Sequence, residues 1–153
     1  LDQYLLEFQR HPHLQAVLEV KPHADLIHES LCVMKTLALV NRYGLENRIT
    51  YITFSPNAMC ELIKYAPKGT EVYYLNGEMS PQQLKVMGAA GMDYHFSVFQ
   101  AHPEWIQECK KLGLKTNAWT VNKADDLRWC IDQGIDFITT NEPELLQQLL
   151  KGN

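Results

Sequence analysis

The residues best suited to chemistry are a carboxylate and an ammonium two positions apart, Glu19 and Lys21, at the end of an apolar run. Alternate side chains of a strand share a face, so both charges point to the same side. In a sheet covered by helices such charges are costly unless they lie at a mouth and bind something. A carboxylate can hold Mg²⁺ or Ca²⁺, and an ammonium can hold a phosphate oxygen. The alternative is an ion pair that faces water and contributes about 0–1 kcal/mol.

Further candidates end other strand-like runs. Trp119 shares a strand face with Asn117, either as core filler or as the wall of a pocket for a polyol or head group. Two turns, 54–56 and 139–143, place small hydroxyl residues before a helix N-terminus, which can cradle an anion. Both turns are equally well explained as ordinary connections between a strand and a helix.

A series of alternating strands and helices must position these residues. Strands are predicted at 16–21, 49–54, 71–75, 92–96, 115–121 and 136–140. From the second strand onward they start roughly 22 residues apart, a period typical of right-handed βα units and a parallel sheet.

Helix boundaries are marked by capping residues. Helices are predicted at 2–8 and 26–40, and Ser55 and Ser80, each followed by proline, are expected N-caps. Left-handed C-caps are expected at Gly91, Gly113 and Gly134. The segment 122–125 resembles a capping box with Asp in place of Glu.

Composition limits the class of protein. With 153 residues and 46% hydrophobic content, we expect a single domain over 1–153. A net charge of −4 without a basic run argues against nucleic-acid binding, and no apolar run approaches the roughly 18 residues that span a bilayer. The chain starts without Met, so an export signal can lie outside it. We expect a soluble protein of the cytoplasm or periplasm.

The cysteines and histidines show no metal-ligand spacing. The four cysteines are isolated within predicted helices and are expected to be buried thiols. The six histidines form no close ligand pair, although a barrel strand could aim His95 inward. No Gly-rich phosphate loop is present. Six βα units fit either an open doubly wound sheet or the later part of an eight-unit barrel, which needs about 250 residues.

Four segments together carry a family resemblance: Leu18–Pro22, Thr53–Ser55, Ala118–Asn122 and Gly134–Thr139. In this order and at this spacing they resemble the later two-thirds of a glycerophosphodiester phosphodiesterase. The resemblance covers essentially the whole chain. It implies an α/β fold of parallel βα repeats, a partial TIM barrel with strands 3–8 of eight.

The resemblance also implies an activity in lipid and glycerol metabolism, the metal-dependent hydrolysis of a small-molecule glycerophosphodiester to glycerol 3-phosphate and an alcohol. By matching position, Glu19 would be a ligand of a divalent cation, Mg²⁺ or Ca²⁺. Lys21 would contact the phosphate, and Phe54 and Trp119 would line the mouth where the glycerol lies.

The chain departs from the family pattern in its histidines. The family's catalytic pair lies in His-Arg-Gly and His-Asp motifs, and no histidine here precedes Arg or Asp. By the resemblance, the family's histidine pair and its other metal carboxylates lie in its first two βα units. This chain corresponds to the later units, so we expect a fragment that is inactive alone. A non-catalytic module that binds phosphate or glycerophosphate, and an unrelated open-sheet α/β domain, are the alternatives. An incomplete barrel is also expected to self-associate through unpaired strand edges near Val17 and Ile138.

Overall fold

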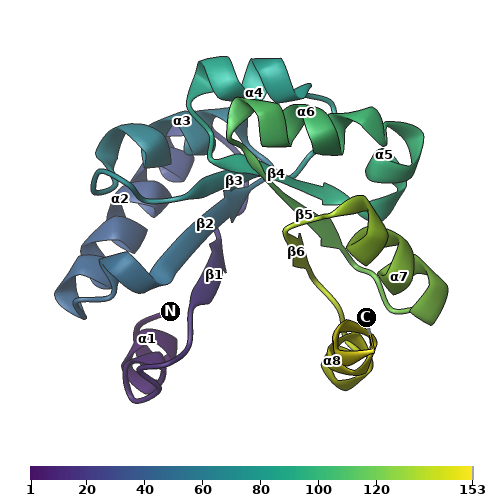
Figure 1. The fold of residues 1–153 in the computed structure, drawn as a ribbon. Coiled ribbons are helices and arrows are strands. Elements are labelled where there is room, and N and C mark those ends of the chain that lie inside the picture. The colour runs from purple at the N-terminus through teal and green to yellow at the C-terminus, as the bar shows by residue number, and fades with distance from the viewer. Residues whose placement is uncertain (153) are drawn as a thin grey trace. The chain divides into compact units, whose positions relative to one another are not determined.

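Strands and helices alternate along the chain in the computed structural model, which describes residues 1–152 (Figure 1). The strands are β1 (Ala16–Glu19), β2 (Ile49–Thr53), β3 (Val72–Tyr74), β4 (Gly91–His95), β5 (Lys115–Trp119) and β6 (Phe137–Ile138). The helices are α1 (Asp2–Gln9), α2 (Leu26–Arg42), the 3₁₀ turn η1 (Glu46–Arg48), α3 (Pro56–Tyr65), α4 (Pro81–Met87), α5 (Phe96–Ala101), α6 (Glu104–Leu112), α7 (Ala124–Gln133) and α8 (Pro143–Lys151). Each predicted strand is present within its predicted range, except that β4 begins one residue earlier.

Two compact units, Leu1–Tyr74 and Leu75–Asn153, divide the chain, and each is described by itself. In unit 1, β1 pairs with β2 and β2 with β3, and in unit 2, β4 pairs with β5 and β5 with β6. All four pairings are parallel, which confirms the predicted α/β class with parallel βα repeats. The single domain over 1–153 stays a prediction.

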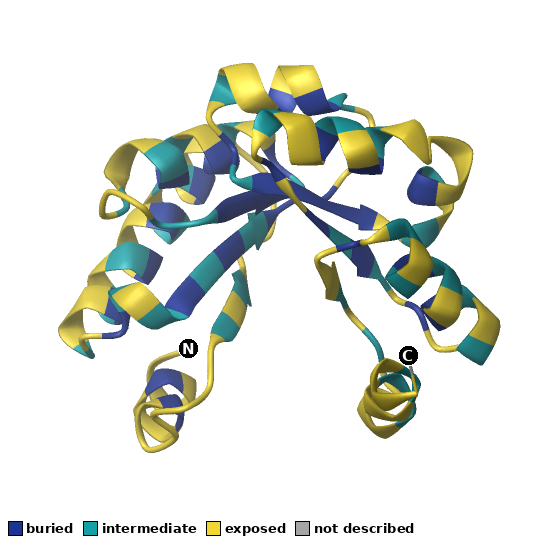
Figure 2. Ribbon diagram, in the orientation of Figure 1, coloured by how far each residue is buried: buried dark blue, intermediate teal, exposed yellow. Residues whose placement is uncertain are grey.

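The core of unit 1 forms where α2 and α3 cover the sheet. β2 alternates buried and half-buried residues, whereas the residues of β1 are half-buried or exposed (Figure 2). The fully buried side chains of unit 1 include Val33, Val40, Tyr51, Met59 and Leu62. Val33 and Val40 in α2, and Met59 and Leu62 in α3, recur at helical spacing, whereas Tyr51 belongs to β2. This spacing explains why the apolar periodicity of residues 26–40 predicted α2.

The core of unit 2 lies around β4 and β5. Four of the five residues of β4 are buried, as expected for a strand covered by helices. The fully buried side chains of this unit include Leu84, Met92, Tyr94, Phe99 and Leu127.

Local capping chemistry fixes several helix ends as predicted. Ser55 caps α3 by accepting from the Ala58 amide at 3.2 Å. Ser80 forms a reciprocal capping box with Gln83 at the start of α4. Gly113 and Gly134 end α6 and α7 in the left-handed conformation.

Two predicted caps are wrong. The left-handed C-cap of α4 is Gly88, with a φ of 84°, and Gly91 instead begins β4. The N-cap of α7 is Lys123 without a side-chain bond, so 122–125 is no capping box. Asn122 is engaged elsewhere, because its Oδ1 accepts from the Asn141 amide at 2.8 Å.

The cysteines all lie in helices, and all four are thiols. Cys109 and Cys130 are buried as predicted, and burial raises the pKa of each to about 12. The prediction of burial is wrong for Cys60, which is exposed on the outer side of α3, and Cys32 is half-buried.

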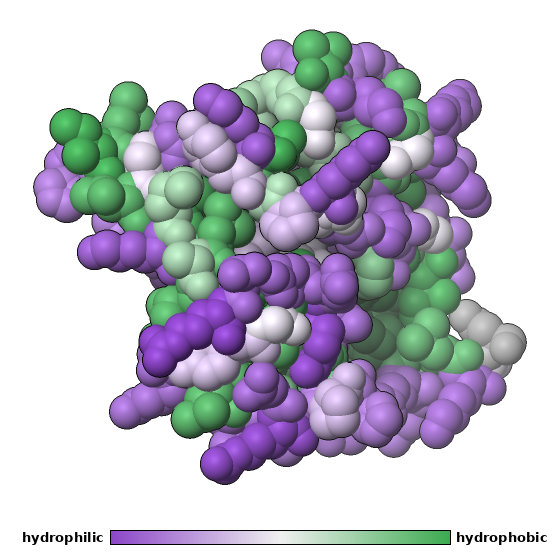
Figure 3. All heavy atoms as spheres, turned by 90° about the vertical axis from the view of Figure 1, so that its left-hand side faces the viewer, coloured by the Kyte–Doolittle hydropathy of each residue, from purple (hydrophilic) through white to green (hydrophobic). Residues whose placement is uncertain are grey.

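The outer surface is mixed in character. Figure 3 shows apolar side chains in small groups separated by hydrophilic ones on the face it presents. Exposed apolar residues of α2 include Leu26, Ile27, Leu31 and Met34. No helix of the described residues is long and apolar enough to cross a membrane.

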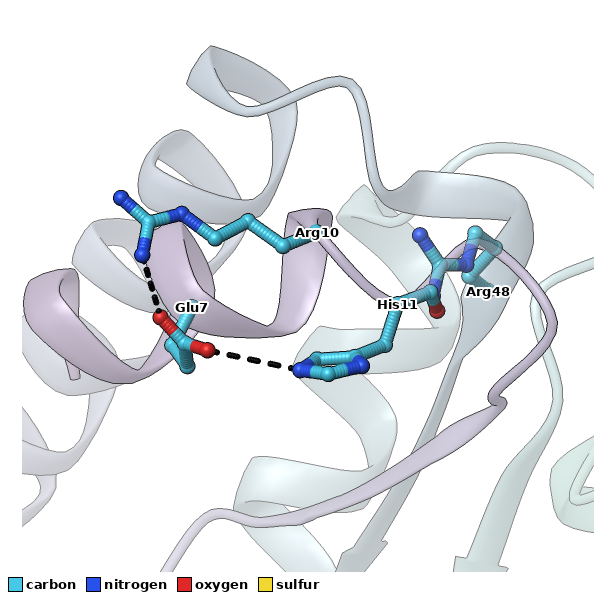
Figure 4. Close-up of polar contacts among 4 residues, drawn as sticks. All are labelled: Glu7, Arg10, His11 and Arg48. Atoms are coloured by element: carbon cyan, nitrogen blue, oxygen red, sulfur yellow. Dashed lines mark hydrogen bonds and ion pairs between the residues drawn. The ribbon is translucent and has the colours of Figure 1, made fainter.

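Arg48 lies beside the segment that joins α1 to β1 in unit 1 (Figure 4), and its guanidinium is hydrogen-bonded to that segment. Its guanidinium donates to the carbonyl of Leu14 at 2.9 Å and to that of His11, and it lies 4.2 Å from the centroid of the Phe8 ring. Beside it, Glu7 accepts from Arg10 at 2.9 Å on the surface. One side chain thus fixes two carbonyls and an aromatic ring immediately before β2 begins.

We expect Arg48→Ala to lower the free energy of unfolding by about 1–3 kcal/mol, because it removes charged hydrogen bonds and a cation–π contact together. Urea denaturation measures the change. Arg10→Ala is the matched control, since an exposed ion pair contributes about 0–1 kcal/mol. Equal losses in the two variants would contradict the anchoring role of Arg48.

Candidate functional site

Glu19 and Lys21 lie together at the carboxyl end of β1. The Nζ atom of Lys21 is 4.0 Å from Oε2 of Glu19, so the two charges point to the same side as predicted. The Lys21 side chain is 77% exposed and that of Glu19 is 31% exposed. An ion pair this open contributes about 0–1 kcal/mol, which leaves the ammonium available to an anion.

The backbone around Lys21 is held on both sides in the β1–α2 turn (residues 20–25). The Val20 amide donates to Ile52 O at 2.9 Å, and the Thr53 hydroxyl donates to Val20 O at 2.7 Å. On the other side, Nδ1 of His23 lies 2.8 Å from Lys21 O. Because a carbonyl only accepts, this ring nitrogen carries the proton.

A buried carboxylate, Glu29, joins this turn to the next one. It lies in the first turn of α2, where it is 3% exposed. Oε1 accepts from the Ser55 hydroxyl at 2.6 Å and from the Asn57 amide at 3.0 Å. Oε2 accepts from the His23 backbone amide at 3.3 Å. The carboxylate therefore contacts both the β1–α2 turn and the start of α3.

Hydrogen bonds stabilise the ionised form of Glu29, as its lowered pKa indicates. Burial raises its pKa, but the hydrogen bonds from Ser55, Asn57 and His23 outweigh that effect, so the pKa lies below the usual 4.5. No sequence pattern marks Glu29, because an acidic side chain in a first helical turn is ordinary and its side-chain partners lie 26 and 28 positions away.

Phe54 lies in the β2–α3 turn (residues 54–55) and is half-buried. The neighbouring Ser55 amide donates to the Thr53 hydroxyl at 3.1 Å, while the Ser55 side chain caps α3. The conformation of the backbone on the carboxyl side of Phe54 is thus fixed by hydrogen bonds.

A complete cation site is not present among residues 1–152, where no three His, Cys, Asp or Glu side chains gather. A hard divalent cation takes six or more oxygen ligands, usually from several carboxylates. Glu19 alone does not fit this requirement.

Two hollows of unit 1 lie away from these turns. One, of about 280 Å³, is lined by residues at the amino ends of the strands, including Gln15, Ile49 and Glu71. The other, of about 300 Å³, lies between α2 and α3 beside Tyr51. Neither is lined by a predicted site residue.

In unit 2, Trp119 is half-buried at the carboxyl end of β5. Its Nε1 donates to Asp93 O at 2.7 Å, and its ring meets that of His95 edge-on, with centroids 5.2 Å apart. Asn117 on the same strand donates to Oδ1 of buried Asp93 at 2.6 Å. The indole is therefore oriented by β4 and keeps part of its surface exposed.

His95 ends β4, as expected for a strand residue, and its ring is exposed. Nδ1 accepts from the Ser97 amide at 3.3 Å, so in the neutral ring the proton is on Nε2. The turn at 139–143 is tied to Asn122, which accepts from the Thr140 hydroxyl at 3.2 Å. Anion binding by that turn stays a prediction.

Comparison with known proteins identifies the family. The sequence model of the Glycerophosphoryl diester phosphodiesterase family matches residues 1–145. The chain belongs to this family. The alternative of an unrelated open-sheet domain is therefore wrong.

Individual relatives agree with the family assignment. A glycerophosphodiester phosphodiesterase of Caldanaerobacter subterraneus is 29% identical over 118 residues, which are 76% of this chain and 48% of the relative. The crystal structure of a glycerophosphodiester phosphodiesterase from Parabacteroides distasonis has a TM-score of 0.96 at 39% identity and matches 99% of this chain and 63% of that one. The fold class, a partial TIM barrel, is confirmed. The chain spans about half the length of the curated relatives it matches.

A more distant structure agrees in fold alone. It is that of an Oleispira antarctica phosphodiesterase in complex with the product sn-glycerol-3-phosphate. Its TM-score is 0.75 at 19% identity, and the match covers 90% of this chain and 55% of that one.

We expect the stabilising effect of Glu29 in this family member to depend on pH. Its pKa is lowered on folding, so its contribution is full above the unfolded value near 4.5 and is lost as the pH falls through the folded value. At pH 7, Glu29→Gln should lower the free energy of unfolding by about 1–3 kcal/mol.

As the pH falls through the folded pKa, Glu29 becomes protonated and takes the shape of glutamine, so the wild type and Glu29→Gln should approach equal stability. Urea denaturation at a series of pH values measures the difference. Glu7→Gln on the surface is the control and should show little change at any pH. A difference for Glu29→Gln that stays constant down to pH 3 would be inconsistent with this assignment.

Proposed function

We propose that the protein carrying this chain hydrolyses glycerophosphodiesters to glycerol 3-phosphate and an alcohol. The family match over residues 1–145 is the observation that carries the proposal. It is supported by the pair Glu19 and Lys21 at the carboxyl end of β1, since the active sites of TIM barrels lie at the carboxyl ends of their strands. The relative with bound sn-glycerol-3-phosphate has the same fold.

Each predicted site residue has a proposed role. Lys21 binds the phosphate through its exposed ammonium, and Phe54 and Trp119 contact the glycerol. Glu19 contributes one oxygen ligand to a divalent cation, Mg²⁺ or Ca²⁺, whose remaining ligands come from outside the described residues.

These 153 residues alone are proposed to be inactive. By the family resemblance, the histidine pair that moves protons lies in other βα units of the whole protein. Without such a group, the leaving alcohol has no proton donor. A module that binds glycerophosphate without catalysis is the second candidate, favoured by the exposed Lys21 on a turn that unit 1 orders by itself.

We expect Lys21→Ala in the intact protein to lower kcat/KM for glycerophosphocholine about 10- to 100-fold, because a charged contact to phosphate is lost. Phosphodiesterase assays with Mg²⁺ or Ca²⁺ measure the change. Lys35, an exposed residue of α2, offers the matched control: Lys35→Ala should have the activity of the wild type. Full activity of Lys21→Ala would overturn the assignment of Lys21, and turnover by residues 1–153 alone would overturn the proposed inactivity.

Self-association through strand edges is also proposed. β1 pairs with β2 among the described residues, and its Val17 is 64% exposed. We expect sedimentation velocity of the 153-residue chain to show dimers or larger species, which grow with concentration. A monomer at all concentrations would be evidence against exposed edges, and Val17→Lys should shift the distribution toward monomer.

A further inference from the structure

The two turns that carry the proposed phosphate and glycerol contacts share one acceptor. Glu29 takes hydrogen bonds from Ser55, Asn57 and His23, which belong to different βα units. β1 and β2 are adjacent and parallel, so the turns that follow them lie at the same end of the sheet. Glu29 is the point at which these turns are joined.

The hydrogen bond between Glu29 and His23 fixes the backbone conformation at Lys21. The His23 amide donates to Glu29, and its Nδ1–H donates to Lys21 O at 2.8 Å. The bond from the His23 ring to Lys21 O closes a turn over residues 21–23. The His23 amide, at the end of this turn, is bound to the buried carboxylate of Glu29. A shift of His23 must therefore change the direction in which the Lys21 side chain leaves the backbone.

The hydrogen bond between Glu29 and Ser55 fixes the backbone conformation next to Phe54. The Ser55 hydroxyl donates to Glu29 at 2.6 Å and accepts from the Ala58 amide at 3.2 Å. The single proton of this hydroxyl is therefore donated to the carboxylate of Glu29. The start of α3 and the peptide after Phe54 are fixed by the same bond.

The character of the Glu29 contacts argues for a positioning role. All three donors are neutral groups, two side chains and a backbone amide, which satisfy a buried charge without an ion pair. A buried carboxylate is disfavoured unless such donors are held in place. We infer that Glu29 is a positioning residue, which sets Lys21 and Phe54 for binding a phosphorylated glycerol; the inference rests on the proposed function.

Glu29→Gln tests this role with little change in size. The amide offers one acceptor oxygen where the carboxylate offers two, so a donor must lose its partner. Calorimetry with sn-glycerol 3-phosphate on the intact protein should show binding weakened about 5- to 30-fold, with the variant folded at the temperature of the assay. Glu61→Gln is the matched control: Glu61 on α3 accepts a hydrogen bond from Ser30 of α2 at 2.5 Å, so this bond joins two helices and not the two turns. It should bind like the wild type.

A double-mutant cycle separates positioning from general loss of structure. Because part of the effect of Glu29 passes through Lys21, Glu29→Gln should weaken binding by a smaller factor when Lys21→Ala is already present. Equal fold losses in both backgrounds would overturn the inference. If Glu29→Gln does not fold, Asn57→Ala removes one of the three donors and should show the same dependence on Lys21 with a smaller effect.

Hydrogen exchange distinguishes failure of this inference from failure of the proposed function. No binding by the wild type would refute the proposed ligand, whereas the His23 amide still reports on the turn. In Glu29→Gln that amide should exchange at least 10-fold faster than in the wild type, and in Glu61→Gln it should not. An unchanged exchange rate at His23 in Glu29→Gln would overturn the inference, with or without binding.

Discussion

A carboxylate buried at the start of α2 requires donors that reach it, and this requirement determines the geometry of unit 1 around its candidate residues. Glu29 is 3% exposed and is satisfied by groups from the two turns that follow β1 and β2. Losing any donor leaves a buried charge short of a partner, so the turns are held together rather than merely adjacent. The exposed side chain of Lys21 therefore extends from a backbone that is fixed on both sides.

The two ends of the strands in unit 1 differ in how their residues are bonded and exposed. At the amino ends, Arg48 fixes carbonyls of the segment between α1 and β1, which is a contribution to stability. At the carboxyl ends, Glu19 and Lys21 are kept near one another with much of their surface in solvent. In barrels of βα units the carboxyl ends of the strands commonly carry the chemistry and the amino ends the stability, which agrees with the proposed site.

The elements could be predicted from the sequence because their causes are local. Ser55 and Ser80 cap helices through bonds to residues three positions away, and Gly113 and Gly134 follow helical periodicity directly. The sequence places the C-cap of α4 at Gly91 wrongly, because Gly88, three residues earlier, ends this helix in the left-handed conformation.

The candidate site was only half predictable. Glu19 and Lys21 follow from strand alternation, but the partners of Glu29 and the engagement of Asn122 with the turn after β6 depend on tertiary contacts. The residue that holds the turns therefore became visible only in the folded chain. The most direct test of the account is a nuclear magnetic resonance titration of the intact protein with sn-glycerol 3-phosphate. The account predicts that the amide signals of Lys21, His23 and Phe54 shift in a saturable way. Saturable shifts confined to the hollow beside Gln15 and Glu71, with those three amides unmoved, would contradict it.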